Sequence, residues 1–328
     1  MLQSIKKLLR TASSGILVLS ATTFLAQTSF AKAAGSKIVI LTVSQECEYC
    51  AKHLKSFLEA AKAAGLDVDV KINNYDPAVQ ATQVDQAIAQ NPAALVLWPA
   101  DANALIPSIR KIKNARIPLV ISNSMPDPKY SKYWDAYTGP NDEELGEHAG
   151  LAMIQGFQDK GYGLKGSIFV IEGVPGTPPQ IQRLDGFKKV LSEKAPDIKI
   201  VGIQPGNWDQ SKATEAAAPL FTQYPDVKGV YAEADNMCAG VIVAAQRAGL
   251  DPSKLVLVGG NFMPEGLKAI SDGTMYGSVE QSPIDDGRYA AQAVVDLLDG
   301  KKVAPTRYLP NPVVTKKDVA EYADSATW

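Results

Sequence analysis

Two cysteines separated by two residues are the feature of the sequence with the most distinctive chemistry. Cys47 and Cys50 follow an apolar run and open an amphipathic stretch, so both are expected near a helix N-terminus, where a thiolate is stabilised. A disulfide, a pair of free thiols and a thioredoxin-like redox centre are the three alternatives. With His53 the cysteines could also form part of a metal site, but the sequence offers no fourth ligand. Cys238 reads as a buried, unpaired thiol.

Other catalytic patterns are weak. The two histidines, His53 and His148, have no serine or cysteine nucleophile placed beside them, so a catalytic triad is not expected. The segment 173–178 is rich in Gly and Pro but lacks the Gly-Lys-Ser/Thr ending of a phosphate-binding loop. We therefore predict a protein that is not an enzyme, holds no cofactor and has no metal site.

The first 33 residues predict export. Lys6, Lys7 and Arg10 precede an apolar stretch from 16 to 26, and a small-residue exit follows at 31–33. That order is typical of a secretory signal peptide. A membrane anchor is the alternative, but the apolar stretch contains hydroxyl residues and is shorter than the ~20 residues of a span. We predict a protein located in the periplasm, an oxidising compartment that favours a local disulfide between Cys47 and Cys50.

Size and charge narrow the class further. Removing residues 1–33 leaves about 295 residues, which is near the size at which one core stops growing, so two lobes are expected. The chain has 33 Lys and Arg against 35 Asp and Glu, and four of the cations lie within 1–33. An acidic mature chain without a basic face argues against a nucleic-acid partner.

The predicted elements alternate between strand and helix in two consecutive series. Near-continuous apolar strands separated by helices are typical of parallel sheets covered on both faces, and two series indicate two doubly wound lobes. Ligands of such sheets bind beyond the carboxyl ends of the strands. The expected strands are 37–43, 68–72, 94–98, 117–122, 167–171, 198–204, 229–233, 255–258 and 277–283. The expected helices are 48–64, 77–90, 102–115, 143–160, 179–194, 210–224, 236–248 and 284–298.

Six strand-end segments occur in the order and spacing found in one known family. These are Ile117–Ile121, Glu172–Thr177, Gln182–Phe187, Val230–Asp235, Leu257–Asn261 and Gly277–Gln281. From about Lys37 to Val314 the chain resembles the ribose-type periplasmic sugar-binding proteins. Each motif is weak alone, but six in register behind an export signal are specific.

The resemblance implies a fold and a role. The fold is the two-lobe, type I periplasmic binding protein fold with three hinge crossings, near 139–140, 281–283 and 309–310. The implied domains are a signal peptide (1–33), an N-terminal lobe (34–139 plus 283–309) and a C-terminal lobe (140–282 plus 310–328). The implied role is a monomeric binding component of an ATP-driven (ABC) importer, with a small sugar or polyol as ligand, a membrane permease as partner and a chemoreceptor as a further partner.

The resemblance also implies ligand-binding positions. Arg183 matches an arginine that binds sugar oxygens, and its planar fork of donors suits that task; a surface pairing with Asp185 or Glu172 is the alternative. Trp208 matches an aromatic that stacks on the sugar, unless it is a core residue. The remaining candidates are Glu48, Cys50, Trp98, Asn123, Asp235, Asn261 and Gln281.

Several of these positions have structural alternatives. Trp98 replaces a polar residue of the family and either forms a second stacking wall or fills space. Glu48 either binds the ligand or complements the helix dipole, and Asp235 either binds it or caps a helix. Asn123 and Ser124 stand where ribose-type members carry aspartate and arginine, so the sequence argues against ribose itself.

Two rival functions come from other classes. A periplasmic thiol-disulfide oxidoreductase would use Cys47 and Cys50, but the chain is about three times too long for a thioredoxin-like fold. A sugar-responsive repressor would need a basic DNA-binding segment where the export signal stands. Sequence cannot separate transport from chemosensing.

Overall fold

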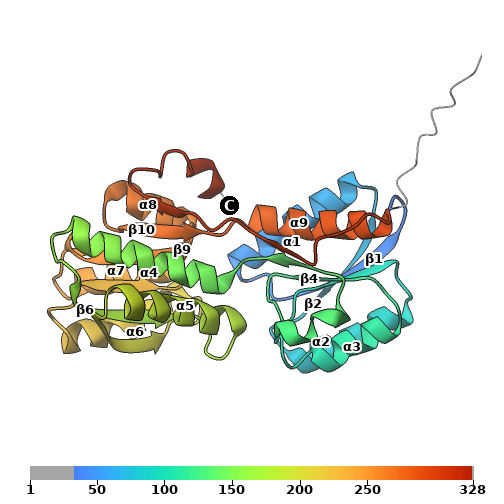
Figure 1. Ribbon diagram of the computed structural model, residues 1–328, viewed down its shortest axis with the longest axis horizontal. Coiled ribbons are helices and arrows are strands. Elements are labelled where there is room, and N and C mark those ends of the chain that lie inside the picture. Colours follow the sequence, from blue (N-terminus) through green and yellow to red (C-terminus); the bar gives the residue numbers. More distant parts are fainter. Residues whose placement is uncertain (1–32, 327–328) are drawn as a thin grey trace, which may run out of the picture. The chain divides into compact units, whose positions relative to one another are not determined.

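The computed structural model describes residues 33–326 of the 328-residue chain. The predicted signal peptide, except Ala33, lies outside the described residues. Within residues 33–326 the main strands form two six-stranded sheets, which we call sheet A and sheet B. Sheet A with the helices that cover it is called lobe 1, and sheet B with its helices is called lobe 2 (Figure 1). No helix of the described part has both the length and the apolar character that a membrane span requires.

Sheet A is parallel throughout, and its strand order shows the crossovers of a doubly wound fold. In spatial order it contains β11 (Thr306–Tyr308), β5 (Ala136–Gly139), β4 (Leu119–Ser122), β3 (Ala94–Leu97), β1 (Lys37–Thr42) and β2 (Asp67–Ile72). The interior strand β1 explains why both faces of the sheet must be covered. Ile38 and Ile40 pack into one core cluster, whereas Val39 and Leu41 pack into another. A strand that is apolar on both faces must be buried on both.

Helices cover both faces of sheet A (Figure 1). One core contains Phe57 of α1 and Val294 of α9, and the other contains Val84 of α2 and Ile109 of α3. Asp76 caps α2 by accepting hydrogen bonds from two backbone N–H groups, as the first turn of a helix requires. The bounds are α1 (Glu48–Ala63), α2 (Pro77–Ala89), α3 (Ile106–Asn114), η1 (Pro128–Tyr133) and α9 (Pro283–Leu298).

Sheet B repeats the arrangement. In spatial order it contains β12 (Val313–Thr315), β10 (Gly277–Glu280), β9 (Val256–Asn261), β8 (Gly229–Ala232), β6 (Lys165–Glu172) and β7 (Asp197–Pro205), with only β12 antiparallel to its neighbour within the described sheet. Its helices are α4 (Asp142–Asp159), α5 (Pro178–Lys194), α6 (Gln210–Gln223), α7 (Asp235–Arg247), α8 (Pro264–Asp272), η2 (Pro252–Lys254) and η3 (Ala323–Ala326). Asn141 caps α4 by accepting a hydrogen bond from the backbone N–H of Glu144.

The chain passes between the two sheets three times within residues 33–326. The passages lie between β5 and α4, between β10 and α9, and between β11 and β12. After the second passage α9 packs against α1, β4 and β5, so this helix belongs with sheet A. The predicted two-lobe, parallel-sheet fold with three crossings is confirmed.

The structure differs from the predicted elements at a few places. Strands β5, β11 and β12 and helix α8 were not expected, because the strands are short and lack a clear pattern. Helix α3 begins at Ile106 rather than at Ala102. The cause is a turn in which Asp101 Oδ1 accepts hydrogen bonds from the backbone N–H groups of Asn103 and Ala104.

Candidate functional site

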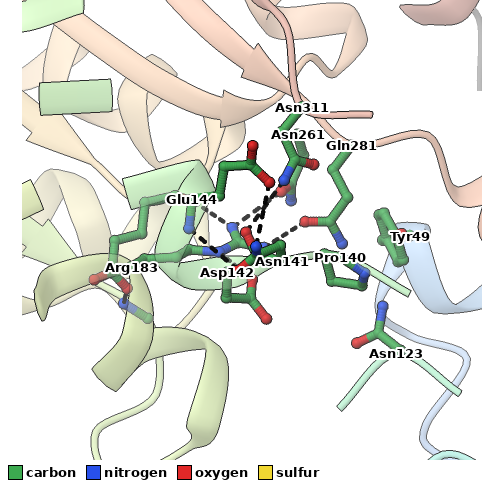
Figure 2. Close-up of polar contacts among 12 residues, drawn as sticks. Tyr49, Asn123, Pro140, Asn141, Asp142, Glu144, Arg183, Asn261, Gln281 and Asn311 are labelled. Atoms are coloured by element: carbon green, nitrogen blue, oxygen red, sulfur yellow. Dashed lines mark hydrogen bonds and ion pairs between the residues drawn. The ribbon is translucent and has the colours of Figure 1, made fainter. Parts of the chain in front are cut away.

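Arg183 is the centre of a polar cluster in lobe 2. Its Nε donates to Asp142 Oδ1 (2.8 Å), and one Nη2 hydrogen is donated to Gln281 Oε1 (2.6 Å). Its Nη1 donates to Asn261 Oδ1 (3.0 Å) and to the backbone oxygen of Glu233 (2.7 Å). The side chain is buried, and Figure 2 shows how these partners surround it. Four of its five N–H donors are thus fixed, which leaves one Nη2 hydrogen without an acceptor in the described part of the chain.

Trp208 stands beside the guanidinium of Arg183. The ring centroid lies 5.4 Å from Cζ of Arg183, within the range of a cation–π contact. The ring also lies on the backbone of Gly173, where an added Cβ would come within 1.9 Å of Trp208 Cζ2. Asn236 fixes the Trp208 loop by donating from Nδ2 to the Trp208 backbone oxygen (2.9 Å). The indole of Trp208 can therefore occupy this position only because residue 173 is glycine.

A buried carboxylate stands at the centre of the lobe 1 half of the site. Asp286, in the first turn of α9, accepts hydrogen bonds at Oδ2 from Tyr49 Oη (2.9 Å) and from Asn123 Nδ2 (2.7 Å). It has no exposed surface, and burial raises its pKa to about 7. Tyr49 in turn interacts with the side chain of Gln281, so this phenol connects Asp286 to the Arg183 cluster.

Further aromatic and polar side chains of lobe 1 pack against the neighbours of that carboxylate. Trp98 makes edge-to-face contacts with Tyr49 (6.1 Å between centroids) and His53 (4.9 Å). His53 Nε2 lies 2.9 Å from Ser122 Oγ, and burial lowers the pKa of His53 to about 3, so the imidazole is neutral at pH 7. Trp98 is only 5% exposed, so most of its surface contacts protein.

Left-handed backbone conformations concentrate at the strand ends of the site. Asn123, Asn207, Trp208, Asn261 and Phe262 all have positive φ angles between 49° and 77°. Asparagine tolerates this region, but for a tryptophan or a phenylalanine it is uncommon. Such residues persist when the surrounding structure holds them, and they are concentrated at functional sites.

Not every candidate residue lies in this cluster. Glu48 is exposed at the start of α1. Asp235 is buried inside lobe 2, where it accepts hydrogen bonds from Ser278 Oγ and from the backbone N–H of Met263. The contacts of Asp235 therefore favour a structural role, and those of Glu48 give it no link to the cluster.

The two cysteines form a disulfide at the start of α1. Cys47 and Cys50 have Cα atoms 5.2 Å apart, and Cys47 Sγ also accepts the backbone N–H of Cys50 as the helix cap. Cys50 is buried and its Sγ lies 3.3 Å from Tyr75 Oη. Cys238 is a buried free thiol. Among residues 33–326 no group of three or more His, Cys, Asp and Glu side chains is arranged to hold a metal ion.

A hollow of about 250 Å³ adjoins the first passage between the sheets. Met125 and Tyr137 line it from lobe 1, and Asp142 and Gln182 line it from lobe 2. Tyr137 Oη lies within hydrogen-bond distance of the backbone oxygens of both Asn123 and Pro140. The hollow therefore reaches Asp142, the ion-pair partner of Arg183, from the hinge side.

Sequence reasoning missed several residues of the cluster. Asp142 and Asp286 are not among the predicted site residues. Tyr49 stands between the candidates Glu48 and Cys50, and Glu233 lies within the segment Val230–Asp235, but neither is a predicted site residue. The sequence does hold one signal, which is that the acid pair Asp285–Asp286 comes directly after the crossing expected at 281–283, close to the strand ends.

Comparisons with known proteins agree with this architecture. The model of the periplasmic binding protein domain family matches residues 38–302. The D-ribose/D-allose-binding protein of Pseudomonas aeruginosa is 28% identical over 229 residues, 69% of each chain. The xylitol-binding protein of Mycolicibacterium smegmatis is 29% identical over 279 residues, 81% of this chain and 76% of that one.

A solved structure gives the same result. The periplasmic solute-binding protein of an ABC transporter from Actinobacillus succinogenes 130z, with bound D-allose, superimposes with a TM-score of 0.79 at 25% identity. The match covers 88% of this chain and 100% of that chain. The chain therefore belongs to the periplasmic binding protein family, and the predicted resemblance to its ribose-type members is confirmed.

Proposed function

We propose that the protein captures a small sugar or polyol between its two lobes and delivers it, chemically unchanged, to the membrane permease of an ABC importer. The observation that carries the proposal is the Arg183 cluster. Four fixed donors hold the guanidinium rigid, and the fifth has no acceptor in residues 33–326. A rigid donor beside the face of Trp208 suits a ligand with hydroxyl oxygens on one side and C–H groups on the other.

The neighbouring side chains support a hydroxyl-rich ligand. Asn123, Asn261 and Gln281 carry amides, each with both donors and acceptors, and a hydroxyl group also both donates and accepts. Of the relatives named above, the first binds D-ribose or D-allose and the second binds xylitol, and the solved structure contains D-allose. These ligands share several hydroxyl groups and carry no charge, which is the chemistry the amides suit.

Closure of the lobes is the mechanism we assign to the protein. Asn123 and Tyr49 belong to lobe 1, whereas Arg183 and Asn261 belong to lobe 2, so a ligand between them stabilises the closed state by contacting both. The passages at 140–141, 281–282 and 309–312 supply the hinge. In this proposal the domains are residues 34–139 plus 283–309 and residues 140–282 plus 310–328, behind a signal peptide of residues 1–33.

The proposal includes location and partners. The protein works as a monomer in the periplasm, and its closed form is the form that the permease, and a chemoreceptor where one exists, recognises. An oxidoreductase based on Cys47 and Cys50 finds no support in the comparisons, whose members are binding proteins.

The test is ligand-dependent stability. We expect at least one of D-ribose, D-allose, xylitol and myo-inositol, or a related compound from a pentose, hexose and polyol panel, to raise the melting temperature, because a ligand that binds only the folded state stabilises it. Trp208→Ala should remove that shift while the unliganded melting temperature changes little. A panel with no active compound, or an unchanged shift in Trp208→Ala, would contradict the proposal.

A further inference from the structure

Asp286 is a buried carboxylate that has no cationic partner in the part of the chain that the structure describes. Its Oδ2 accepts two hydrogen bonds, from Tyr49 and Asn123, and its Oδ1 accepts none. In residues 33–326 the one basic group within 4.0 Å is His53, whose Nε2 lies 3.9 Å from Oδ1. His53 is fully buried with a lowered pKa, so it is neutral and does not compensate the charge.

Within the described residues, none of the groups that face Asp286 from the surrounding elements is cationic. Helix α1 contributes Tyr49 and His53, and the end of β4 contributes Ser122 and Asn123. Tyr137 of β5 and Asp142 of α4 act at longer range, and the negative charge of Asp142 opposes ionisation of Asp286. Arg183, the cation of the cluster, is already paired with Asp142.

Asp286 and Asn123 each have an oxygen that accepts no hydrogen bond within the described residues: Oδ1 of Asp286, and Oδ1 of Asn123, whose Nδ2 is directed to Asp286. An ammonium group has three N–H donors and no acceptor, so it suits oxygens that still lack a donor. Buried charges are ordinarily paired, because an unpaired one loses its hydration without compensation.

We propose that Asp286 receives a protonated amine of the ligand, so that the captured solute is an amino sugar or an amino polyol. This inference rests on the proposed function, because it assigns one end of a hydroxyl-rich ligand to lobe 1. The hydroxyl groups of the solute then face Arg183 and the amides of lobe 2. With its pKa raised to about 7, Asp286 carries a proton below about pH 7 when the cleft is empty, and it releases that proton when the amine binds.

Matched compounds test the inference. The pairs are D-glucosamine with D-glucose, D-galactosamine with D-galactose, and D-mannosamine with D-mannose, measured by calorimetry and thermal shift at about pH 6, where the amines are charged. We expect one amine to bind about tenfold or more tightly than its neutral partner. Asp286→Asn should bring that ratio close to one.

Asp285→Asn is the matched control variant. Asp285 is the preceding residue in the same helical turn, but it is paired at the surface with Arg288 (2.7 Å). Its replacement removes the same charge without touching Asp286, so the preference for the amine should persist. If both variants lose the preference equally, a general change of charge at the helix start explains the effect and the inference is overturned.

A measurement on the unaltered protein guards against misfolding of Asp286→Asn. Titration of the amine in two buffers with different ionisation enthalpies should give a net release approaching one proton at about pH 6. Tight binding of neutral sugars with no preference for amines, or amine binding without proton release, would overturn the inference and leave the proposed function standing. Failure of every pair and of the neutral panel would reject both.

Discussion

Replacement of Arg183 by methionine gives the sharpest test of the lobe 2 cluster, because the guanidinium both faces the site and holds it together. The change keeps the aliphatic part of the side chain and removes four hydrogen bonds, including the ion pair with Asp142 (2.8 Å). Asp142 is 5% exposed, so its carboxylate would lose its only described ion-pair partner in a site largely closed to water. Breaking one side of a buried pair costs ~3–5 kcal/mol of unfolding free energy.

Urea unfolding at pH 7 measures this cost, and a second substitution isolates its cause. Asp142→Asn in the Arg183→Met background removes the unpaired charge, so we expect it to recover ~1–3 kcal/mol. Arg288→Met removes an exposed ion pair on α9 and should change stability by less than ~1 kcal/mol. A loss below ~1 kcal/mol for Arg183→Met, or no recovery in the double variant, would refute the reasoning.

Three further predictions concern the indole, the buried acid of lobe 2 and the disulfide. Gly173→Ala should displace the Trp208 ring, seen as a shift of tryptophan fluorescence, and weaken ligand binding by at least about tenfold; unchanged fluorescence and affinity would contradict it. Burial raises the pKa of Asp235 from an unfolded value near 4 to about 8, so the stability it contributes is complete below about pH 4 and is lost as pH rises through 8. The pH dependence of urea unfolding between about pH 5 and 8 should therefore be flatter in Asp235→Asn, and an identical slope would count against this account. Cys47→Ser with Cys50→Ser should lower the unfolding free energy by ~2 kcal/mol, as expected for a short loop, and leave ligand binding detectable by calorimetry; loss of all binding would show that the disulfide shapes the cleft.

Much of the Arg183 cluster follows from sequence, because the residues that contact Arg183 include two that stand at the carboxyl ends of strands, where the sequence placed candidates. Asn261 ends β9 and Gln281 follows β10, and both contact Arg183. Trp208 follows β7 in a Pro-Gly-Asn loop, where a core role is disfavoured. Each of these residues ends or follows a strand of the same sheet, so its position in the sequence is enough to predict that the three lie near one another.

The strand-end rule does not say which way a side chain points. Asp235 follows β8 like a ligand residue, yet its carboxylate turns to Ser278 and the backbone of Met263 inside lobe 2. Glycines at 259 and 266 make room for it, since a Cβ at either position would lie about 2 Å from an Asp235 oxygen. That packing depends on residues far apart in the chain, and periodicity carries no information about it.

The strand-end rule also misses the lobe 1 carboxylate, Asp286, because this residue lies on a helix. The sequence shows Asn123 where ribose-type proteins carry aspartate, which suggested that the negative charge is lost. In the structure a carboxylate lies next to Asn123 after all, but it comes from α9. The second passage between the sheets places Asp286 Oδ2 2.7 Å from Asn123 Nδ2. A prediction of this contact requires the docking of α9 on α1, which periodicity does not specify.

A crystal structure of the protein with the most tightly bound compound of the panels tests the central claim most directly. The account predicts an intact ligand between the lobes, contacted by Asn123 or Tyr49 on one side and by Arg183 and Gln281 on the other. A ligand held by one lobe alone, a ligand outside this cluster, or a chemically altered ligand would contradict it.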